Sequence, residues 1–343
     1  MEKTFYSEPI EKNTRYRTEY QDSIASFLEV EKKKAQDQRE TFMNPKAYKE
    51  DMEKYRQDFI QQLGFPLVNK KEYPLLAEKT FVVCDHNVNI YRMQFQFSNG
   101  IKGYGIYFEQ VKSSKDTPFI IGFHGGAGTP ELVGSIHNNS ANYNHLVRRM
   151  TERGANVFAP QLLIWERDIY GGNYSRKETD GKLRQLGGSI TALELLLIRG
   201  YLDYFIQQEG INEDKIGVAG LSYGGMYAIH FAAIEPRVKA CYSCSWVSNG
   251  FVYSWPDWSY LNAQRAFSVA ETAALICPRP LSIAMGNRDE LFNSDLTEIE
   301  CSKIKEFYSE FNAEEKFQCV IFDGVHELDK GEKELDFLFS YLR

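Results

Sequence analysis

The sequence lacks long apolar runs, an apolar leader and an excess of positive charge. No apolar run approaches the roughly 20 residues that a bilayer helix needs, and the first ten residues (MEKTFYSEPI) lack the apolar centre of a secretion signal. With 47 acidic against 40 basic residues the formal charge is -7, which disfavours contact with nucleic acid and with anionic lipid. We therefore expect a soluble cytoplasmic protein that binds neither nucleic acid nor membrane.

Cysteine is also scarce. Six cysteines in 343 residues are too few for a disulfide scaffold, and their scatter is typical of buried, reduced thiols (Cys84, Cys241, Cys244, Cys277, Cys301 and Cys319). Cys241 and Cys244 form a C-x-x-C in a strand-like segment, where residues three apart point to opposite faces, and no second pair completes a zinc site. Because the sequence also has no H-E-x-x-H motif or His/Asp cluster, no metal and no cofactor is expected.

Charge is concentrated near the N-terminus. Of the first 71 residues 27 are charged, and the composition shifts near residues 65–72. Apolar residues recur at spacings of three and four from Tyr48 to Leu63, which predicts one face of a helix that ends before Gly64. We predict a helical arm over residues 1–71 packed on a catalytic domain over residues 72–343. Partner binding by this arm and a homo-oligomer are alternatives.

The remainder reads as an α/β sheet. Short β-rich runs at 80–84, 90–97 and 104–110 predict an antiparallel entry meander. Apolar strand-like runs then alternate with helical stretches, at 119–123, 155–160, 215–220, 238–244, 279–286 and 317–322. This rhythm is typical of a mostly parallel, twisted sheet with flanking crossover helices.

The strongest chemical signal is the sequence GLSYGG at residues 220–225, which follows a predicted strand and opens a predicted helix. A nucleophile at such a turn needs small neighbours, because strand and helix approach closely there, and Gly220 and Gly224 supply the room. Ser222 is therefore the predicted nucleophile. The backbone N–H of Tyr223 lies at the helix N-terminus, where it can meet a developing oxyanion.

A second glycine-rich sequence, HGGAG at residues 124–128, ends the strand at 119–123. Its glycines allow backbone N–H groups to point into a cavity, so we expect this loop to complete the oxyanion hole. Gly126 and Ala127 are the leading donors. We interpret His124 as a histidine that braces the loop, since a later histidine fits the role of base better.

A serine hydroxyl needs an imidazole to accept its proton and a carboxylate to orient that imidazole. Asp289 and His326 both follow predicted strands, and the carboxyl ends of parallel strands share one edge of a sheet. The order Ser222, Asp289, His326 is that of hydrolases. Glu290 and Asp323 compete for the role of acid. The other histidines lack this strand-end setting (His86, His137, His145 and His230).

These motifs resemble the α/β-hydrolase superfamily, specifically its dienelactone-hydrolase-like and acetyl-xylan-esterase-like branch. The resemblance covers roughly residues 75–343 and is carried by HGGAG at 124–128, GLSYGG at 220–225, CPRPLSIAMGNRDELF at 277–292 and DGVHEL at 323–328. It implies Ser222 as nucleophile, Asp289 as acid and His326 as base of a serine esterase. Dienelactone hydrolases proper have a cysteine in place of Ser222, so ring-opening of dienelactone is not expected.

Two other functions compete. The run GLSYGGMYA is similar to prolyl-oligopeptidase-type peptidases, but only about 70 residues precede the core, too few for a propeller. A hydrolase fold can also serve as a non-catalytic binding protein, against which the complete Ser, Asp and His set argues. We predict hydrolysis of a small-molecule carboxylic ester with a short acyl group, such as an acetylated carbohydrate.

Two aromatic segments, 161–174 and 246–267, follow strands on the predicted active edge. They could form a cap that offers flat apolar surface to an acyl chain or a sugar ring. The predicted substrate contacts are the tryptophans of these segments (Trp165, Trp246, Trp255 and Trp258).

Overall fold

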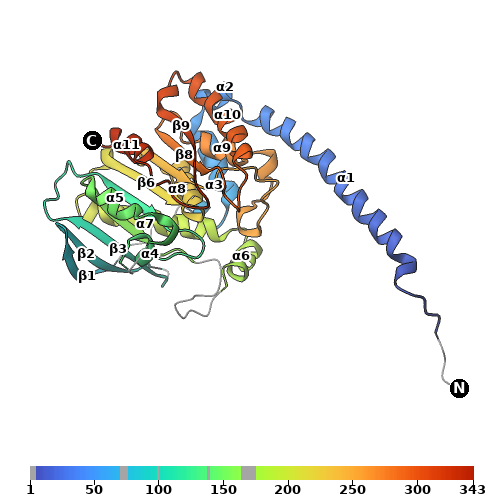
Figure 1. Cartoon of the computed structure of the whole chain (residues 1–343), viewed down its shortest axis with the longest axis horizontal. Helices are drawn as coiled ribbons and strands as arrows, with labels where there is room; N and C mark the ends of the chain where they lie inside the picture. Colours follow the sequence, from blue (N-terminus) through green and yellow to red (C-terminus); the bar gives the residue numbers. More distant parts are fainter. Residues whose placement is uncertain (1–4, 70–75, 99, 137–139, 164–174) are drawn as a thin grey trace.

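The computed structural model describes residues 5–69, 76–98, 100–136, 140–163 and 175–343. A central twisted sheet carries helices on both faces, and one long helix projects from the body (Figure 1). Trp165, His137 and most of the predicted cap segment 161–174 lie outside the described residues. The predicted boundary between arm and catalytic domain, at residues 71 and 72, also falls outside them.

The described strands form one nine-stranded sheet in the order β1-β2-β3-β5-β4-β6-β7-β8-β9. The antiparallel entry strands are β1 (Leu76–Asp85), β2 (Val88–Gln96) and β3 (Lys102–Gln110). The parallel strands are β4 (Phe119–Phe123), β5 (Asn156–Pro160), β6 (Ile216–Leu221), β7 (Ala240–Cys244), β8 (Leu281–Gly286) and β9 (Phe317–Phe322). Strand β3 joins the two parts by antiparallel pairing with β5. The predicted α/β class, with its antiparallel start and parallel continuation, is confirmed.

Helices cover the two faces of this sheet. They are α4 (Pro130–Val133), α5 (Leu146–Glu152), α6 (Arg176–Gln185), α7 (Ile190–Gln208), α8 (Tyr223–Ile234), α9 (Val269–Ala274), α10 (Ser294–Glu310) and α11 (Lys333–Ser340). Neighbouring residues of β4 point to opposite faces, so Ile120 joins the core under α5 and α11 while Ile121 joins the core under α7 and α8. The core therefore has two layers, one on each face.

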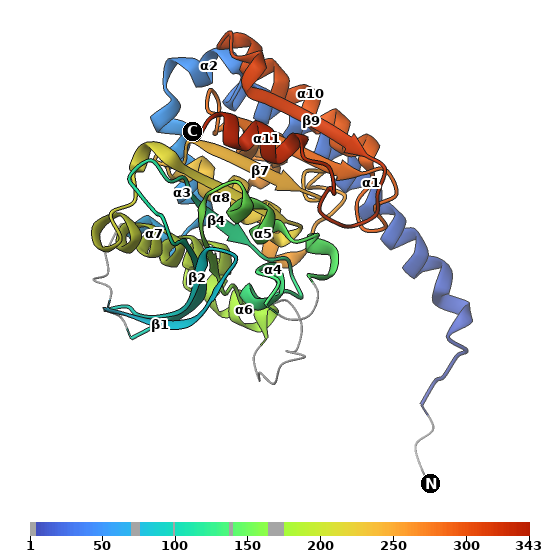
Figure 2. The same ribbon diagram turned by 60° about the vertical axis from the view of Figure 1, so that its left-hand side comes forward.

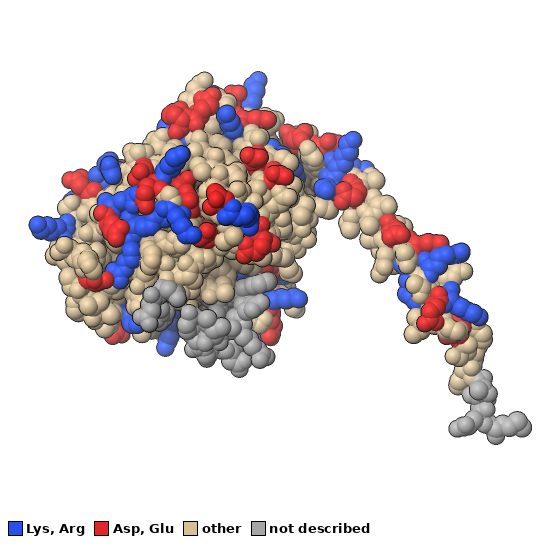
Figure 3. Space-filling model, in the orientation of Figure 1, with Lys and Arg blue, Asp and Glu red and all other residues tan. Residues whose placement is uncertain are grey.

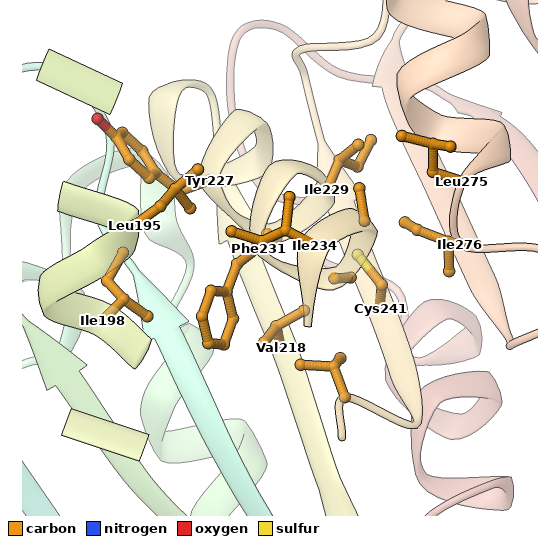
Figure 4. Close-up of a cluster of buried hydrophobic side chains, with 14 of the residues drawn as sticks. Leu195, Ile198, Val218, Tyr227, Ile229, Phe231, Ile234, Cys241, Leu275 and Ile276 are labelled. Carbon is orange, nitrogen blue, oxygen red and sulfur yellow. The ribbon is translucent and has the colours of Figure 1, made fainter. Parts of the chain in front are cut away.

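Helix α8 is the centre of the larger layer. All of its residues are buried. Figure 4 shows α8 side chains such as Phe231 and Ile234 between α7, strand β6 and the turn after α9. Such complete burial fixes the start of α8 relative to the sheet, which matters because the predicted nucleophile lies at that start.

The N-terminal region contains α1 (Glu11–Phe42), α2 (Pro45–Glu50) and α3 (Met52–Leu63). We expected one continuous helical face from Tyr48 to Leu63, and this was wrong, because the chain breaks at Asp51. The Asp51 backbone leaves the helical region, with φ -151° and ψ 70°, and its carboxylate accepts a hydrogen bond from the N–H of Lys54 to cap α3. The predicted end is confirmed, with Gly64 at φ 84° after the last turn.

Within the described part of the chain, helix α1 contacts the body through its second half alone. Its first half projects away in both ribbon views (Figures 1 and 2) and exposes large apolar side chains such as Tyr16, Tyr20 and Ile24. Near its end, Arg39 is buried and forms an ion pair of 2.9 Å with Glu271. Acidic and basic side chains alternate along α1 and over the visible face of the body (Figure 3). None of the described helices has the length and apolarity to cross a membrane.

The cysteines are all unpaired, and Cys241 and Cys244 are buried in β7 as expected. Burial raises the pKa of Cys244 to about 12, so this thiol stays protonated. Cys84 is exposed, contrary to the prediction of a buried thiol. The reason is that Cys84 lies on β1, an edge strand whose residues are mostly exposed.

Candidate active site

Ser222 lies at the sharp turn between β6 and α8. Its backbone has φ 60° and ψ -122°, outside the regions that L residues favour. Two hydrogen bonds hold it there: the N–H of Ser222 donates to the carbonyl of Cys244 at 2.9 Å, and its carbonyl accepts from the N–H of Met226 at 3.0 Å. The side chain is partly exposed. This geometry is that of a nucleophile elbow.

The glycines around Ser222 are required by close packing. A Cβ atom on Gly220 would lie 2.3 Å from the backbone of Gly224, and one on Gly224 would lie 2.3 Å from the carbonyl oxygen of Phe123. Strand β6, the start of α8 and the end of β4 therefore meet with no space for a side chain. This contact brings the HGGAG loop beside Ser222.

Two sets of backbone N–H groups face this region. The N–H of Tyr223, in the first turn of α8, has no hydrogen-bond partner among the described residues. In the HGGAG loop, Gly125 donates its N–H to the Tyr143 hydroxyl at 2.7 Å, and Gly128 donates to the Gly125 carbonyl at 3.0 Å. The N–H groups of Gly126 and Ala127, the predicted donors, have no partner within the described part of the chain. Their role as oxyanion donors stays a prediction.

His124 is buried at the base of this loop. Its Nδ1 lies 2.7 Å from the Gly125 carbonyl, and its Nε2 accepts the N–H of Leu162 at 2.9 Å. Both ring nitrogens are thereby engaged, with the proton on Nδ1. Burial lowers the pKa of His124 to about 4, so the ring is neutral at pH 7. The interpretation of His124 as a brace agrees with this geometry.

Asp289 and His326 come together at the carboxyl ends of β8 and β9. Asp289 Oδ2 accepts a hydrogen bond from His326 Nδ1 at 2.8 Å, and the Asp289 side chain is fully buried. Asp289 Oδ1 accepts the N–H groups of Leu291 and Phe292 at 2.9 and 3.0 Å. Burial by itself would raise the pKa of Asp289, but the His326 contact and the two N–H groups hold it below its usual range.

The competing carboxylates have other contacts. Glu290 accepts the backbone N–H of His326 at 3.2 Å and is otherwise exposed, so it supports the loop and not the imidazole ring. Asp323 forms an ion pair with Arg288 at the surface. Of these carboxylates, Asp289 is therefore the one bonded to the ring.

The loops of Ser222 and His326 meet at the end of β7. The Cys244 carbonyl accepts the Ser222 N–H, and the Cys244 thiol donates to the carbonyl of Glu327, next to His326, at 3.3 Å. Asn142 anchors the same loop by donating its side-chain N–H to the His326 carbonyl at 3.0 Å. Since Asp289 occupies Nδ1 of His326, Nε2 is the nitrogen left to exchange a proton. The roles of the three residues stay a prediction.

The aromatic segment 246–267 packs in layers beside His326. Trp258 stacks on Phe292, with ring centres 5.7 Å apart, and Phe292 lies 5.8 Å from the His326 ring. Trp255 packs against Trp258 at 4.5 Å. Trp246 is buried deeper, against His230 and Trp258. Together with Trp258 it lines a cavity of about 500 Å³ beside residues 28–35 of α1. Of the described tryptophans, Trp258 and Trp255 thus lie nearest the imidazole.

Several residues of the site were not predicted. Phe292 follows the Asp289 loop directly, and the segment CPRPLSIAMGNRDELF contained that signal. Tyr143, which holds the HGGAG loop, lies in a stretch without any motif. Buried Arg176 and its partners, described below, carry no sequence signal either. Among the described residues no cluster of His, Cys, Asp or Glu has the arrangement of a metal site.

Comparison with solved structures identifies the fold. The glucuronoyl esterase from Solibacter usitatus superposes with a TM-score of 0.67 at 13% identity, over 88% of this chain and 95% of that one. Acetyl xylan esterase 1 from Thermoanaerobacterium sp. JW/SL YS485 superposes with a TM-score of 0.55 at 17% identity, over 86% and 94%. The chain has the α/β-hydrolase fold.

The sequence comparisons are more limited. No family model matches this α/β-hydrolase-fold chain. A protein of Bacillus subtilis (strain 168) named "Putative hydrolase YtaP" is 33% identical over 103 residues, which is 26% of this chain. The match spans about a third of that relative's length (33%). At these levels of identity and coverage, the activity has to be argued from the site.

Proposed function

We propose that this protein is a serine hydrolase that cleaves a carboxylic ester with a short acyl group, such as an acetylated carbohydrate. The observation that carries the proposal is the hydrogen bond of 2.8 Å between Asp289 and His326 on the same sheet edge as the strained turn at Ser222. The esterase names of the similar structures and the hydrolase name of the relative favour the same chemistry.

In the proposed mechanism, Ser222 Oγ attacks the ester carbonyl carbon while His326 Nε2 takes the hydroxyl proton. Asp289 keeps the other ring proton on Nδ1 and stabilises the imidazolium. The carbonyl oxygen becomes an oxyanion, to which the N–H groups of Tyr223 and of Gly126 or Ala127 donate. His326 then protonates the leaving alcohol, and a water molecule, activated by the same imidazole, releases the acid and restores the Ser222 hydroxyl.

The substrate would lie against the aromatic segment. Trp258 and Trp255 offer flat apolar rings that are separated from His326 by the side chain of Phe292. This setting is suited to an acyl chain or a sugar face. Trp165 belongs to the same proposal on sequence grounds alone. The cytoplasmic location expected from the sequence stays a prediction, which cell fractionation tests.

The test combines active-site labelling with a substrate panel. The wild-type protein should be labelled stoichiometrically by a fluorophosphonate and should hydrolyse p-nitrophenyl acetate and acetylated xylo-oligosaccharides. Ser222→Ala should lose both, with an unchanged melting temperature. Absence of labelling in the wild type would favour a non-catalytic binding protein. Rapid cleavage of dipeptidyl anilides with negligible esterase activity would favour a peptidase instead.

Ser245 provides a matched control. It also follows a strand with a positive φ, 51°, but its side chain is fully buried. Ser245→Ala should therefore still be labelled by the fluorophosphonate. If Ser245→Ala lost labelling while Ser222→Ala kept it, the nucleophile would be Ser245 and not Ser222.

A further inference from the structure

A buried guanidinium packs against Tyr223, the residue that follows the predicted nucleophile. Arg176, the first residue of α6, is 1% exposed, and all of its nitrogens donate hydrogen bonds. Nε donates to Asp257 Oδ2 at 2.7 Å, Nη1 to Glu194 Oε2 and to the Leu163 carbonyl at 2.8 Å each, and Nη2 to the Tyr227 hydroxyl at 2.8 Å. We call the five side chains that meet here the Arg176 cluster (Arg176, Glu194, Tyr223, Tyr227 and Asp257).

This cluster holds the residue that follows the nucleophile. The Tyr223 hydroxyl donates to Asp257 Oδ2 at 2.6 Å, so one carboxylate oxygen accepts from both Tyr223 and Arg176. The guanidinium carbon of Arg176 also lies 5.0 Å from the centre of the Tyr223 ring, in cation–π contact. Tyr223 is thus fixed by its ring and by its hydroxyl.

The protonation states suit this arrangement. Burial, followed by the negative charge of Asp257, raises the pKa of Tyr223, so the hydroxyl keeps its proton at neutral pH. Burial alone would lower the pKa of Arg176, but the surrounding carboxylates raise it well above its usual range. A guanidinium that stays charged can hold two carboxylates in fixed places.

The cluster also connects segments that are far apart in sequence. Asp257 belongs to the short helix η4 (Pro256–Trp258) of the aromatic segment, and Glu194 belongs to α7. Trp258, next to Asp257, packs its ring edge-on against Tyr223 at 4.8 Å and stacks on Phe292. The Arg176 guanidinium therefore sets the distance between the start of α8 and the aromatic side chains beside His326, which are Trp258 and Phe292.

We propose that Arg176 and Asp257 are positioning residues that hold the backbone N–H of Tyr223 where the oxyanion forms. The inference rests on the proposed function, because it makes the bond between the Tyr223 hydroxyl and the Asp257 carboxylate responsible for placing a predicted oxyanion donor. A backbone N–H in the first turn of a helix moves with its own side chain, and small misplacements of such a donor cost rate at the transition state. Arg176 and Asp257 would thus act on kcat through Tyr223, without touching substrate.

Two matched substitutions separate positioning from simple stability. Tyr223→Phe removes only the hydroxyl that bonds Asp257. Tyr227→Phe removes the equivalent hydroxyl one turn later on the same helix. That hydroxyl bonds Glu194 and Arg176, but the backbone N–H of Tyr227 is not a predicted oxyanion donor. Tyr223→Phe loses one buried hydrogen bond and Tyr227→Phe loses two, so both should melt a few degrees lower than the wild type.

The expected difference is in catalysis. Tyr223→Phe should lower kcat for p-nitrophenyl acetate about 10- to 100-fold with KM nearly unchanged, and should slow fluorophosphonate labelling of Ser222 by the same factor. Labelling reports the oxyanion hole because the phosphoryl oxygen occupies it. Tyr227→Phe should keep both rates near those of the wild type. Asp257→Asn added to Tyr223→Phe should lower kcat little further, because the two side chains act through one bond.

The outcomes are distinguishable. A Tyr223→Phe protein with wild-type kcat and labelling rate, or a Tyr227→Phe protein that loses as much, would overturn the positioning role and leave the proposed function standing. A wild-type protein that is neither labelled nor active would overturn the proposed function and the inference together. If Tyr223→Phe does not fold, Asp257→Asn alone carries the same measurement, with the same two results deciding.

Discussion

At the residue scale, the choice among neighbouring carboxylates depends on which oxygen reaches the imidazole ring. Asp289 and Glu290 are adjacent in sequence, yet only Asp289 is buried and bonded to His326 Nδ1, whereas Glu290 bonds the backbone N–H of His326. A buried carboxylate on Nδ1 selects the tautomer in which Nε2 can accept a proton. The two side chains should therefore differ greatly in their effect on catalysis.

Replacing Asp289 by Asn should lower kcat for p-nitrophenyl acetate by about 10³- to 10⁴-fold, because the amide leaves the imidazole without a charged partner. KM should change little. Glu290→Gln is the matched control, since its amide oxygen still accepts the backbone N–H and the ring contact is untouched. Steady-state kinetics at pH 7 to 8 decide. Equal losses in the two variants would mean that Asp289 is not the acid.

At the element scale, α8 joins the turn at Ser222 to the deepest part of the core. His230, two turns along this helix, is 2% exposed and packs against the rings of Phe59, Trp246 and Tyr260. Its Nδ1 lies 2.9 Å from the Met226 carbonyl, and burial lowers its pKa to about 4. The helix that carries the elbow therefore contains a histidine that is neutral while folded and protonated more readily once unfolded.

This difference makes the folded state sensitive to acid. In the unfolded chain a histidine has a pKa near 6.5, so between about pH 6.5 and pH 4 the unfolded state binds more protons and stability falls as pH falls. Between pH 7 and pH 5 the loss is about 2 kcal/mol for His230. His230→Phe should remove that share of the loss. Chemical denaturation of both proteins at pH 7 and pH 5 measures it, and an unchanged difference between the two pH values would contradict the assignment.

At the scale of the whole molecule, the chain is a compact body with the α/β-hydrolase fold and half of a long helix outside it. The ion pairs and hydrogen bonds that α1 makes with the body begin at Glu31, which pairs with Arg265. They include those of Arg39, whose guanidinium bonds Glu271 and the Gln264 carbonyl. Burial raises the pKa of Glu271, whereas the charge of Arg39 acts to lower it. The second half of α1 should therefore stabilise the body, and the first half should not.

Removal of residues 1–26 should leave the melting temperature and the esterase activity of the protein nearly unchanged. Arg39→Met should lower the free energy of unfolding by about 3 kcal/mol, because it leaves the Glu271 carboxylate buried without its charged partner. Thermal and urea unfolding of the two proteins measure these effects. A large loss of stability on truncation would show that the exposed apolar side chains of α1 are covered in solution, and sedimentation would then show whether a second copy covers them.

Most of the fold could be predicted because it depends on local patterns. The strand runs at 119–123 and 317–322 have the predicted bounds, since apolar periodicity and flanking glycines act over a few residues. The break between α2 and α3 was missed because a single capping carboxylate, Asp51, outweighed the continuing apolar face. The exposure of Cys84 was missed because the position of a strand within the sheet is not a local property.

The sequence by itself determined that the sharp turn at Ser222 exists, because GLSYGG between an apolar strand and an apolar helix permits little else. It also placed Asp289 and His326 at strand ends. Only the tertiary structure decided which carboxylate meets the imidazole, and only it revealed the Arg176 cluster, whose members lie up to 81 residues from Arg176. A turn is fixed by neighbours along the chain, whereas a buried charge finds its partners only when the separate elements have packed.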